Sequence, residues 1–163
     1  RAGNVIGGGD WSEDRLIPDA VRAWMADQML YIRNPDAVRP WQHVLEPLSG
    51  YLALATYLWE NPEAADAYNF GPYPSSFQTV EELIYQASAR VKGRWTILPQ
   101  ENAPHEAGLL TLATEKATTI LGWSPRWGFL ETIHRTMDWY SSVYARQSAL
   151  EQMHLDIDDF YAG

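Results

Sequence analysis

Two arginines, Arg33 and Arg39, flank a short turn, and an aromatic residue and a histidine follow within residues 41–43. A guanidinium is planar and carries several N–H donors, so it binds a phosphate through parallel hydrogen bonds and stacks on aromatic rings. Such residues suit a nucleoside diphosphate. They are equally consistent with a solvated loop in which the arginines pair with aspartates. Residues 32–44 therefore predict either a phosphate site or an exposed, ion-paired loop.

A run of three glycines, Gly7–Gly9, follows the apolar end of residues 2–6 and precedes Asp10. Dinucleotide binding in a Rossmann fold requires the spacing Gly-x-Gly-x-x-Gly, which lets a pyrophosphate approach the beginning of a helix. The run in this chain lacks that spacing. By itself it predicts a tight loop after a strand and not a cofactor site.

His105 and Glu106 are neighbours in the sequence and form a candidate acid–base pair. Adjacent side chains need not converge, however, and a single histidine fits a structural role equally well. The chain contains four histidines: His43, His105, His134 and His154. None of them shows the short ligand spacing of a zinc site, and the chain has no cysteine. We therefore predict neither a metal site nor a disulfide.

The charge of the chain limits its possible ligands. A net charge of −9 argues against general nucleic-acid binding, which needs a basic surface. Five arginines nevertheless lie within residues 1–50, so an anionic ligand could bind where several of them converge. Residues 147–163 carry four acids and no Lys or Arg, and we expect a solvated end there.

The hydrophobic residues, 46% of the chain, suffice for a core, but no apolar run approaches the roughly 20 residues of a membrane span. We therefore expect no membrane partner. No leader sequence is expected either, because no charged and apolar segment follows Arg1. The absence of cysteine is compatible with the cytoplasmic location that we expect.

Hydrophobic spacing and helix-capping residues predict helices that alternate with short strands, which is typical of α/β or α+β proteins. Strands are expected over residues 2–6, 30–32, 67–70 and 95–97. Helices are expected over residues 17–25, 47–59, 80–91, 115–121 and 130–144. Thr79 and Glu82 form a capping box, Thr114 can cap the following helix, and Gly122 suits the position after its end. In residues 47–59, Leu48 and Leu52 are expected on the buried stripe, followed by Ala55 and Leu58 or Trp59.

Five stretches resemble one known family in the same order along the chain. They are residues 1–11 with 14–19, residues 32–35 with 38–48, and residues 68–71, 121–125 and 136–140, within a resemblance that covers about residues 1–146. The sequence Arg-Pro-Trp-Gln-His at residues 39–43 is especially informative, because related dehydratases and epimerases carry an Arg-Asp-Trp version there. The chain resembles the CDP-glucose 4,6-dehydratases, a branch of the extended short-chain dehydrogenase/reductase family.

The resemblance implies an α/β fold, the carboxy-terminal part of an extended Rossmann-type enzyme and mainly its small α+β substrate-binding domain. Residues 1–163 would form one domain, and the NAD-binding Rossmann portion would be absent. The family's catalytic Tyr-x-x-x-Lys is missing, because Lys92 and Lys116 are preceded at that spacing by Ser88 and Leu112. No catalytic residue is therefore assigned, and the chain alone is expected to be inactive.

The resemblance also implies six substrate-binding residues: Asn4 on the phosphate side, Arg15 and Leu16 in the pocket wall, Arg33 near the base, Arg39 at the diphosphate and His105 beside the nucleotide. Residues 107–109 depart from the family, where Arg, His or Tyr are common, so one anchoring contact is expected to be missing. The implied partner is a nucleotide sugar, CDP-glucose. A homo-oligomer or other self-association is also expected, since the missing sheet neighbours would leave unpaired strand edges and apolar surface.

In the complete enzyme the resemblance implies an internal redox cycle: NAD takes a hydride from C4, water leaves across C5–C6, and the hydride returns at C6. The product would be CDP-4-dehydro-6-deoxyglucose. Two alternatives remain open. A sister epimerase or decarboxylase acting on another nucleotide sugar is disfavoured by residues 32–35. A non-catalytic, truncated binding or interaction domain is consistent with the missing Tyr and Lys.

Overall fold

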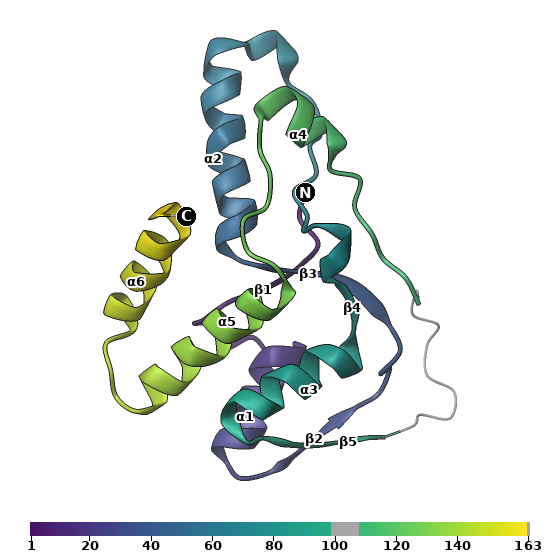
Figure 1. Ribbon diagram of the computed structural model, residues 1–163, viewed down its shortest axis with the longest axis vertical. Coiled ribbons are helices and arrows are strands. Elements are labelled where there is room, and N and C mark those ends of the chain that lie inside the picture. Colours follow the sequence, from purple (N-terminus) through teal and green to yellow (C-terminus); the bar gives the residue numbers. More distant parts are fainter. Residues whose placement is uncertain (99–107, 163) are drawn as a thin grey trace.

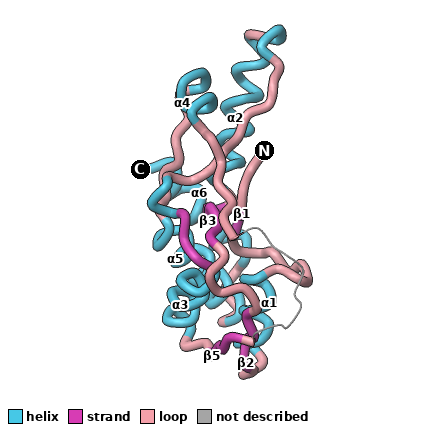
Figure 2. The backbone as a smooth tube through the Cα atoms, turned by 90° about the vertical axis from the view of Figure 1, so that its right-hand side faces the viewer, coloured by secondary structure: helices cyan, strands magenta, loops and turns pink. Residues whose placement is uncertain are grey.

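The computed structural model describes residues 1–98 and 108–162. Its strands are β1 (Asn4–Ile6), β2 (Met29–Ile32), β3 (Val38–His43), β4 (Phe77–Thr79) and β5 (Arg94–Ile97). Its helices are α1 (Leu16–Met25), α2 (Leu45–Glu60), α3 (Val80–Val91), α4 (Glu115–Leu121), α5 (Phe129–Tyr144) and α6 (Ala149–Ala162). Two 3-10 turns cover Pro62–Ala64 and Pro74–Ser76. The molecule is elongated, with α2 and α4 at one end and β2 and β5 at the other (Figures 1 and 2).

Two small sheets form the frame of the molecule. In the first, β3 lies between β1 and β4, parallel to β1 and antiparallel to β4. Asn4 is opposite Trp41 in the β1–β3 pair, and Val38 is opposite Thr79 in the β3–β4 pair. The second sheet pairs β2 with β5 in parallel, with Leu30 opposite Trp95. The predicted mixture of helices and short strands is confirmed.

The main core lies where α1, α3 and α5 pack together and against the strands (Figure 1). The predicted helix faces supply it: Ile17 and Val21 from α1, Leu83 from α3, and Ile133 and Met137 from α5 are at most 2% exposed. Burying each of these side chains contributes about 1.5–3 kcal/mol relative to leaving it in water. The 3.6-residue periodicity therefore located the centre of each buried face, but Leu130 and Tyr144, which it also placed on the face of α5, are 50% and 65% exposed.

Local capping signals had mixed outcomes. The Thr79 hydroxyl accepts a hydrogen bond from the Glu82 N–H at 3.0 Å, which confirms the predicted helix start. Gly122 ends α4 in the left-handed region with φ of 63°, as predicted for a residue just past a helix. Thr114 precedes α4 but makes no side-chain capping bond, so that prediction was wrong.

The stripe predicted for residues 47–59 is not buried. Leu48, Leu52 and Trp59 are 46%, 64% and 89% exposed, whereas the buried residues of α2 are Glu46, Pro47 and Gly50. Gly50 faces Phe70, because a side chain on Gly50 would overlap that ring. The spacing of apolar residues shows which face of a helix would gain from burial, but it does not show whether another segment covers that face.

Three segments were not predicted as they occur. The acidic end, expected to be solvated, forms α6, which packs on α5. Its Phe160 is only 1% exposed and packs edge-on against Trp127, which precedes α5. Strand β3 occupies residues that were assigned to no element, and residues 67–70 contribute only the isolated parallel bridge between Phe70 and Ala2. Arg135 ties α6 to α5 through ion pairs with Asp156 and Asp159.

Candidate functional site

A cavity of about 730 Å³ opens between β1, the beginning of α1, β2 and β3. Five of the six residues predicted to bind substrate line it: Asn4, Arg15, Leu16, Arg33 and Arg39. The sixth, His105, lies outside the described residues. The structure thus brings together side chains from four different elements, which the order of the residues alone does not require.

Strand β3 positions Arg39 and Trp41 on the same wall of the cavity. Side chains alternate along a strand, so residues two apart point to the same side. Arg39 is only 7% exposed, and one of its guanidinium N–H groups donates to the Val38 carbonyl at 3.0 Å. The Trp41 indole N–H donates to the Gln78 carbonyl at 2.9 Å, which fixes the ring. Arg39 therefore lies buried in a strand and not in an exposed loop, the alternative that its sequence left open.

Arg33 and Arg15 approach the cavity from its rim. Arg33 follows the last residue of β2 and is exposed, in contrast to its buried neighbour Ile32. Arg15 is also exposed and precedes the first turn of α1, with its guanidinium 4.0 Å from the Asp10 carboxylate. Exposed cations at the rim and a buried one in the wall are an arrangement that suits an anionic ligand.

Three carboxylates also line the cavity: Asp10, Asp14 and Asp19. Burial opposes ionisation of Asp10, but hydrogen bonds from Ser12 and the charge of Arg15 outweigh it and lower the pKa of Asp10 below its usual value. The Asp10 carboxylate is therefore charged at neutral pH. These acids, together with Tyr31 and Trp41, were not predicted as site residues, because isolated acids and aromatic residues carry no recognisable spacing.

The residues after Trp41 do not take part in the cavity. Gln42 and His43 are 0% and 2% exposed, and the Gln42 amide donates to the Phe70 carbonyl at 3.0 Å. The His43 ring packs edge-on against Trp127. Burial, together with the charge of Arg135, lowers the pKa of His43 to about 4. The sequence placed this histidine beside the phosphate-binding arginines, but the structure makes it a neutral core residue.

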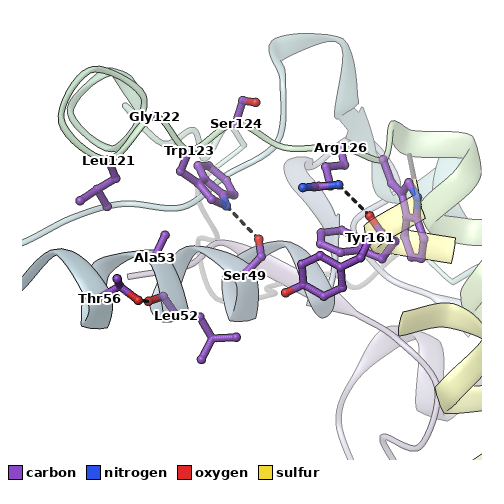
Figure 3. Close-up of a pocket in the computed structure, with 12 residues that line it drawn as sticks. Ser49, Leu52, Ala53, Thr56, Leu121, Gly122, Trp123, Ser124, Arg126 and Tyr161 are labelled. Atoms are coloured by element: carbon purple, nitrogen blue, oxygen red, sulfur yellow. Dashed lines mark hydrogen bonds between the residues drawn. The ribbon is translucent and has the colours of Figure 1, made fainter. Parts of the chain in front are cut away.

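A second hollow of about 720 Å³ lies between α2, the segment 121–127 and α6 (Figure 3). The Trp123 indole N–H donates to the Ser49 hydroxyl at 2.9 Å across it. The Arg126 guanidinium donates to the Phe160 carbonyl at 3.0 Å, and this hydrogen bond connects the segment 121–127 to α6 (Figure 3). None of the five predicted substrate residues that the structure describes lines this hollow.

Within residues 1–98 and 108–162, no three His, Cys, Asp or Glu side chains gather as metal ligands would. Over the same ranges, no helix combines the length and apolar character that crossing a membrane requires. The described cavity also contains no paired acid and base with opposing pKa shifts. Its chemistry, as far as this chain supplies it, is that of binding an anion next to aromatic side chains.

The fold is that of part of the sugar-nucleotide epimerases and dehydratases. A UDP-glucose-4-epimerase from Stenotrophomonas maltophila, with bound NAD and a formylated UDP-arabinopyranose, has a TM-score of 0.72 and 17% identity, covering 90% of this chain and 48% of its own. A dTDP-glucose 4,6-dehydratase from Bacillus anthracis, in complex with NAD, has a TM-score of 0.71 and 19% identity, with coverages of 87% and 43%. The fold class predicted from the sequence is therefore confirmed.

A curated relative is much more similar to this chain in sequence than these solved structures are. The chain is 45% identical to a CDP-glucose 4,6-dehydratase from Salmonella typhimurium, in an alignment of 164 residues that covers 98% of this chain. It spans about 45% of the length of that relative. None of the family models compared matches the chain. The resemblance to CDP-glucose 4,6-dehydratases that the sequence indicated is confirmed.

Proposed function

We propose that this chain is the sugar-nucleotide-binding part of an NAD-dependent CDP-glucose 4,6-dehydratase, and that the cavity binds CDP-glucose. The observation that carries the proposal is the convergence of Arg15, Arg33 and Arg39 on one cavity next to Trp41. The 45% identity to a CDP-glucose 4,6-dehydratase supports CDP-glucose over other nucleotide sugars. The product of the whole enzyme would be CDP-4-dehydro-6-deoxyglucose.

The buried Arg39 is the residue best placed to bind the diphosphate. Its side chain lies in a sheet and not on a loop, so little conformational freedom is lost when an anion binds. The rim residues Arg15 and Arg33 can then adjust to the sugar and base sides. Together the three arginines would position the substrate, which is the entropic contribution to catalysis.

The residues present do not fit NAD. The glycine run lacks the Gly-x-Gly-x-x-Gly spacing that dinucleotide binding requires, and its middle residue packs against α5, where a side chain on Gly8 would overlap the Trp139 ring. The Tyr-x-x-x-Lys pair is also missing. We therefore assign NAD binding and the hydride steps to the portion of such enzymes that this chain does not span, and treat residues 1–163 as one substrate-binding domain. A cytoplasmic location belongs to the same proposal.

Self-association is also part of the proposal. The exposed face of α2 carries Leu48, Tyr51, Leu52 and Trp59, each at least 42% exposed. Contiguous apolar surface of this kind commonly marks an interface. Oligomer formation through α2 would remove it from water.

Calorimetric titration of the chain with CDP-glucose tests the proposal, with UDP-glucose and dTDP-glucose as matched competitors. We expect CDP-glucose to bind best. Preferential binding of another nucleotide sugar would favour a sister epimerase or decarboxylase. No binding of any nucleotide sugar would favour a non-catalytic interaction domain, which the missing Tyr and Lys also allow. With NAD added, the chain alone should form no 4-keto product, and turnover above the blank would contradict the assignment of the chemistry elsewhere.

A further inference from the structure

Residues 7–14 connect β1 to the residues that begin α1 and form one edge of the cavity. Asp10 and Asp14 within this segment line the cavity, and Arg15 follows directly. The conformation of the segment therefore sets where these three charges point. Two helices, α5 and α1, hold it from outside the cavity.

Helix α5 holds the segment through Trp139 and Tyr140. Gly8 lies directly on the Trp139 ring, where any side chain would overlap it, and Gly9 adopts φ of 84°, which other residues rarely do. The Tyr140 hydroxyl donates to the Asp10 carbonyl at 2.5 Å. Its ring is 1% exposed and packs edge-on against Trp11, with 5.2 Å between the ring centroids.

Helix α1 holds the next two residues through Arg22. Its guanidinium donates to the Trp11 carbonyl at 2.8 Å and to the Ser12 carbonyl at 3.0 Å, and it also pairs with Asp19. Three consecutive carbonyls, those of residues 10–12, are thus bound by side chains of two helices. The backbone is fixed from the outside while the Asp10 carboxylate faces Arg15 on the cavity side.

We propose that Tyr140 and Arg22 are positioning residues for the sugar-nucleotide cavity, which hold residues 10–12 in the binding geometry before the ligand arrives. This inference rests on the proposed function. A segment that is already ordered avoids the loss of backbone freedom on binding, so its attachment to the two helices raises affinity without a contact to the ligand. Burial, with the Asp10 charge, raises the pKa of Tyr140 to about 12, so the phenol keeps its proton at neutral pH and remains a donor.

The test compares Tyr140→Phe, which removes one hydroxyl and keeps the ring, with Tyr144→Phe, which removes a hydroxyl from a residue of the same helix that is 65% exposed. The unmodified chain and both variants are titrated with CDP-glucose and followed by amide hydrogen exchange. We expect Tyr140→Phe to bind about 3- to 10-fold more weakly, the effect of one lost hydrogen bond. Exchange should accelerate within residues 8–13 and stay unchanged in α1 and α5. Tyr144→Phe should match the unmodified chain in both measurements.

Arg22 provides the second arm of the experiment. Arg22→Ala should also weaken binding and accelerate exchange in residues 8–13. Arg22→Lys should restore part of both, because an ammonium keeps the charge and N–H donors but lacks the two separate guanidinium nitrogens that bind the Trp11 and Ser12 carbonyls. A Tyr140→Phe chain that binds as tightly as the unmodified chain would overturn the inference. Acceleration of exchange throughout the protein would also overturn it, since that shows a general structural role. An unmodified chain that binds no CDP-glucose would instead overturn the proposed function on which the inference rests.

Discussion

Replacing Arg39 with alanine removes the most buried cation of the candidate site. The side chain lies in β3, is 7% exposed and lines the cavity. If it binds the diphosphate, its removal deletes a charge-assisted hydrogen bond worth about 1.5–3 kcal/mol. At about 1.4 kcal/mol per tenfold change, CDP-glucose should bind roughly 10- to 150-fold more weakly to Arg39→Ala.

Arg39→Lys separates charge from geometry. An ammonium retains the positive charge but loses the planar fork that binds two phosphate oxygens together. We therefore expect Arg39→Lys to recover only part of the affinity. Arg39→Ala also loses the hydrogen bond from the guanidinium to the Val38 carbonyl, so a small fall in melting temperature should accompany the fall in affinity.

A matched control is Arg94→Ala. Arg94 lies on β5, is paired with Asp27 on the surface and lines neither hollow. Its removal should cost about 0–1 kcal/mol of stability and leave ligand affinity unchanged. Calorimetric titration and a melting curve for each variant are the measurements. Unchanged affinity in Arg39→Ala, with the protein still folded, would refute the assignment of Arg39 to the diphosphate.

Three further predictions concern the rest of the molecule. Leu52→Glu places a charge on the exposed face of α2 and should reduce self-association, measured by sedimentation; an identical distribution of species would exclude α2 as the interface. His43 has its pKa lowered from 6.5 to about 4, so its contribution to stability is present above pH 6.5 and is lost as pH falls through 4, by roughly 3 kcal/mol. Measured by urea denaturation, the free energy of unfolding of His43→Phe should fall less between pH 6.5 and 4 than that of the unmodified chain. Equal falls in the two proteins would contradict this prediction. Gly8→Ala should lower the free energy of unfolding by about 1–3 kcal/mol, because its methyl overlaps Trp139; a melting temperature unchanged from the original would contradict the packing described.

Features that depend on a few adjacent residues were predictable from the sequence. The Thr79 cap and the Gly122 helix end are local, because the capping bond and the left-handed backbone each involve residues within one turn. The buried faces of α1, α3 and α5 were predictable for a similar reason, since a helix with one apolar face has only one way to bury it.

Strand β3 could not be predicted because its partners are distant and its residues look unlike a central strand. Pro40 lacks an N–H, and proline is therefore disfavoured in a central strand, whose backbone forms hydrogen bonds with a neighbouring strand on each side. The structure resolves this, since β1 pairs with residues 41–43 while β4 pairs with residues 38–40, so β3 changes partners at the proline. Such an exchange depends on tertiary arrangement and leaves no periodic signal.

The candidate site was reached by resemblance and not by spacing. Arg15, Arg33 and Arg39 come from three different elements, and no regular interval links them. Arg39 and His43 belong to the same short stretch of sequence, residues 39–43, although one lines the cavity and the other is a core residue. Whether a strand residue faces a ligand or the core depends on what packs on each side, which a single sequence does not show.

The parallel pairing of β2 with β5 has a consequence for the order in which the protein can be made. The strand that leads to Arg33 has Leu30 opposite Trp95, so its neighbour in the sheet is synthesised long after it. Until then β2 presents unpaired backbone groups along with the exposed side chains of Met29 and Tyr31. A growing chain will therefore carry all three cavity arginines before it can complete the wall beside Arg33. The wall beside Arg33 cannot form before Ile97 has left the ribosome, and the whole cavity must wait for Leu110, which lines it, and for Tyr140, which holds Asp10. Until then the nascent chain is most open to aggregation.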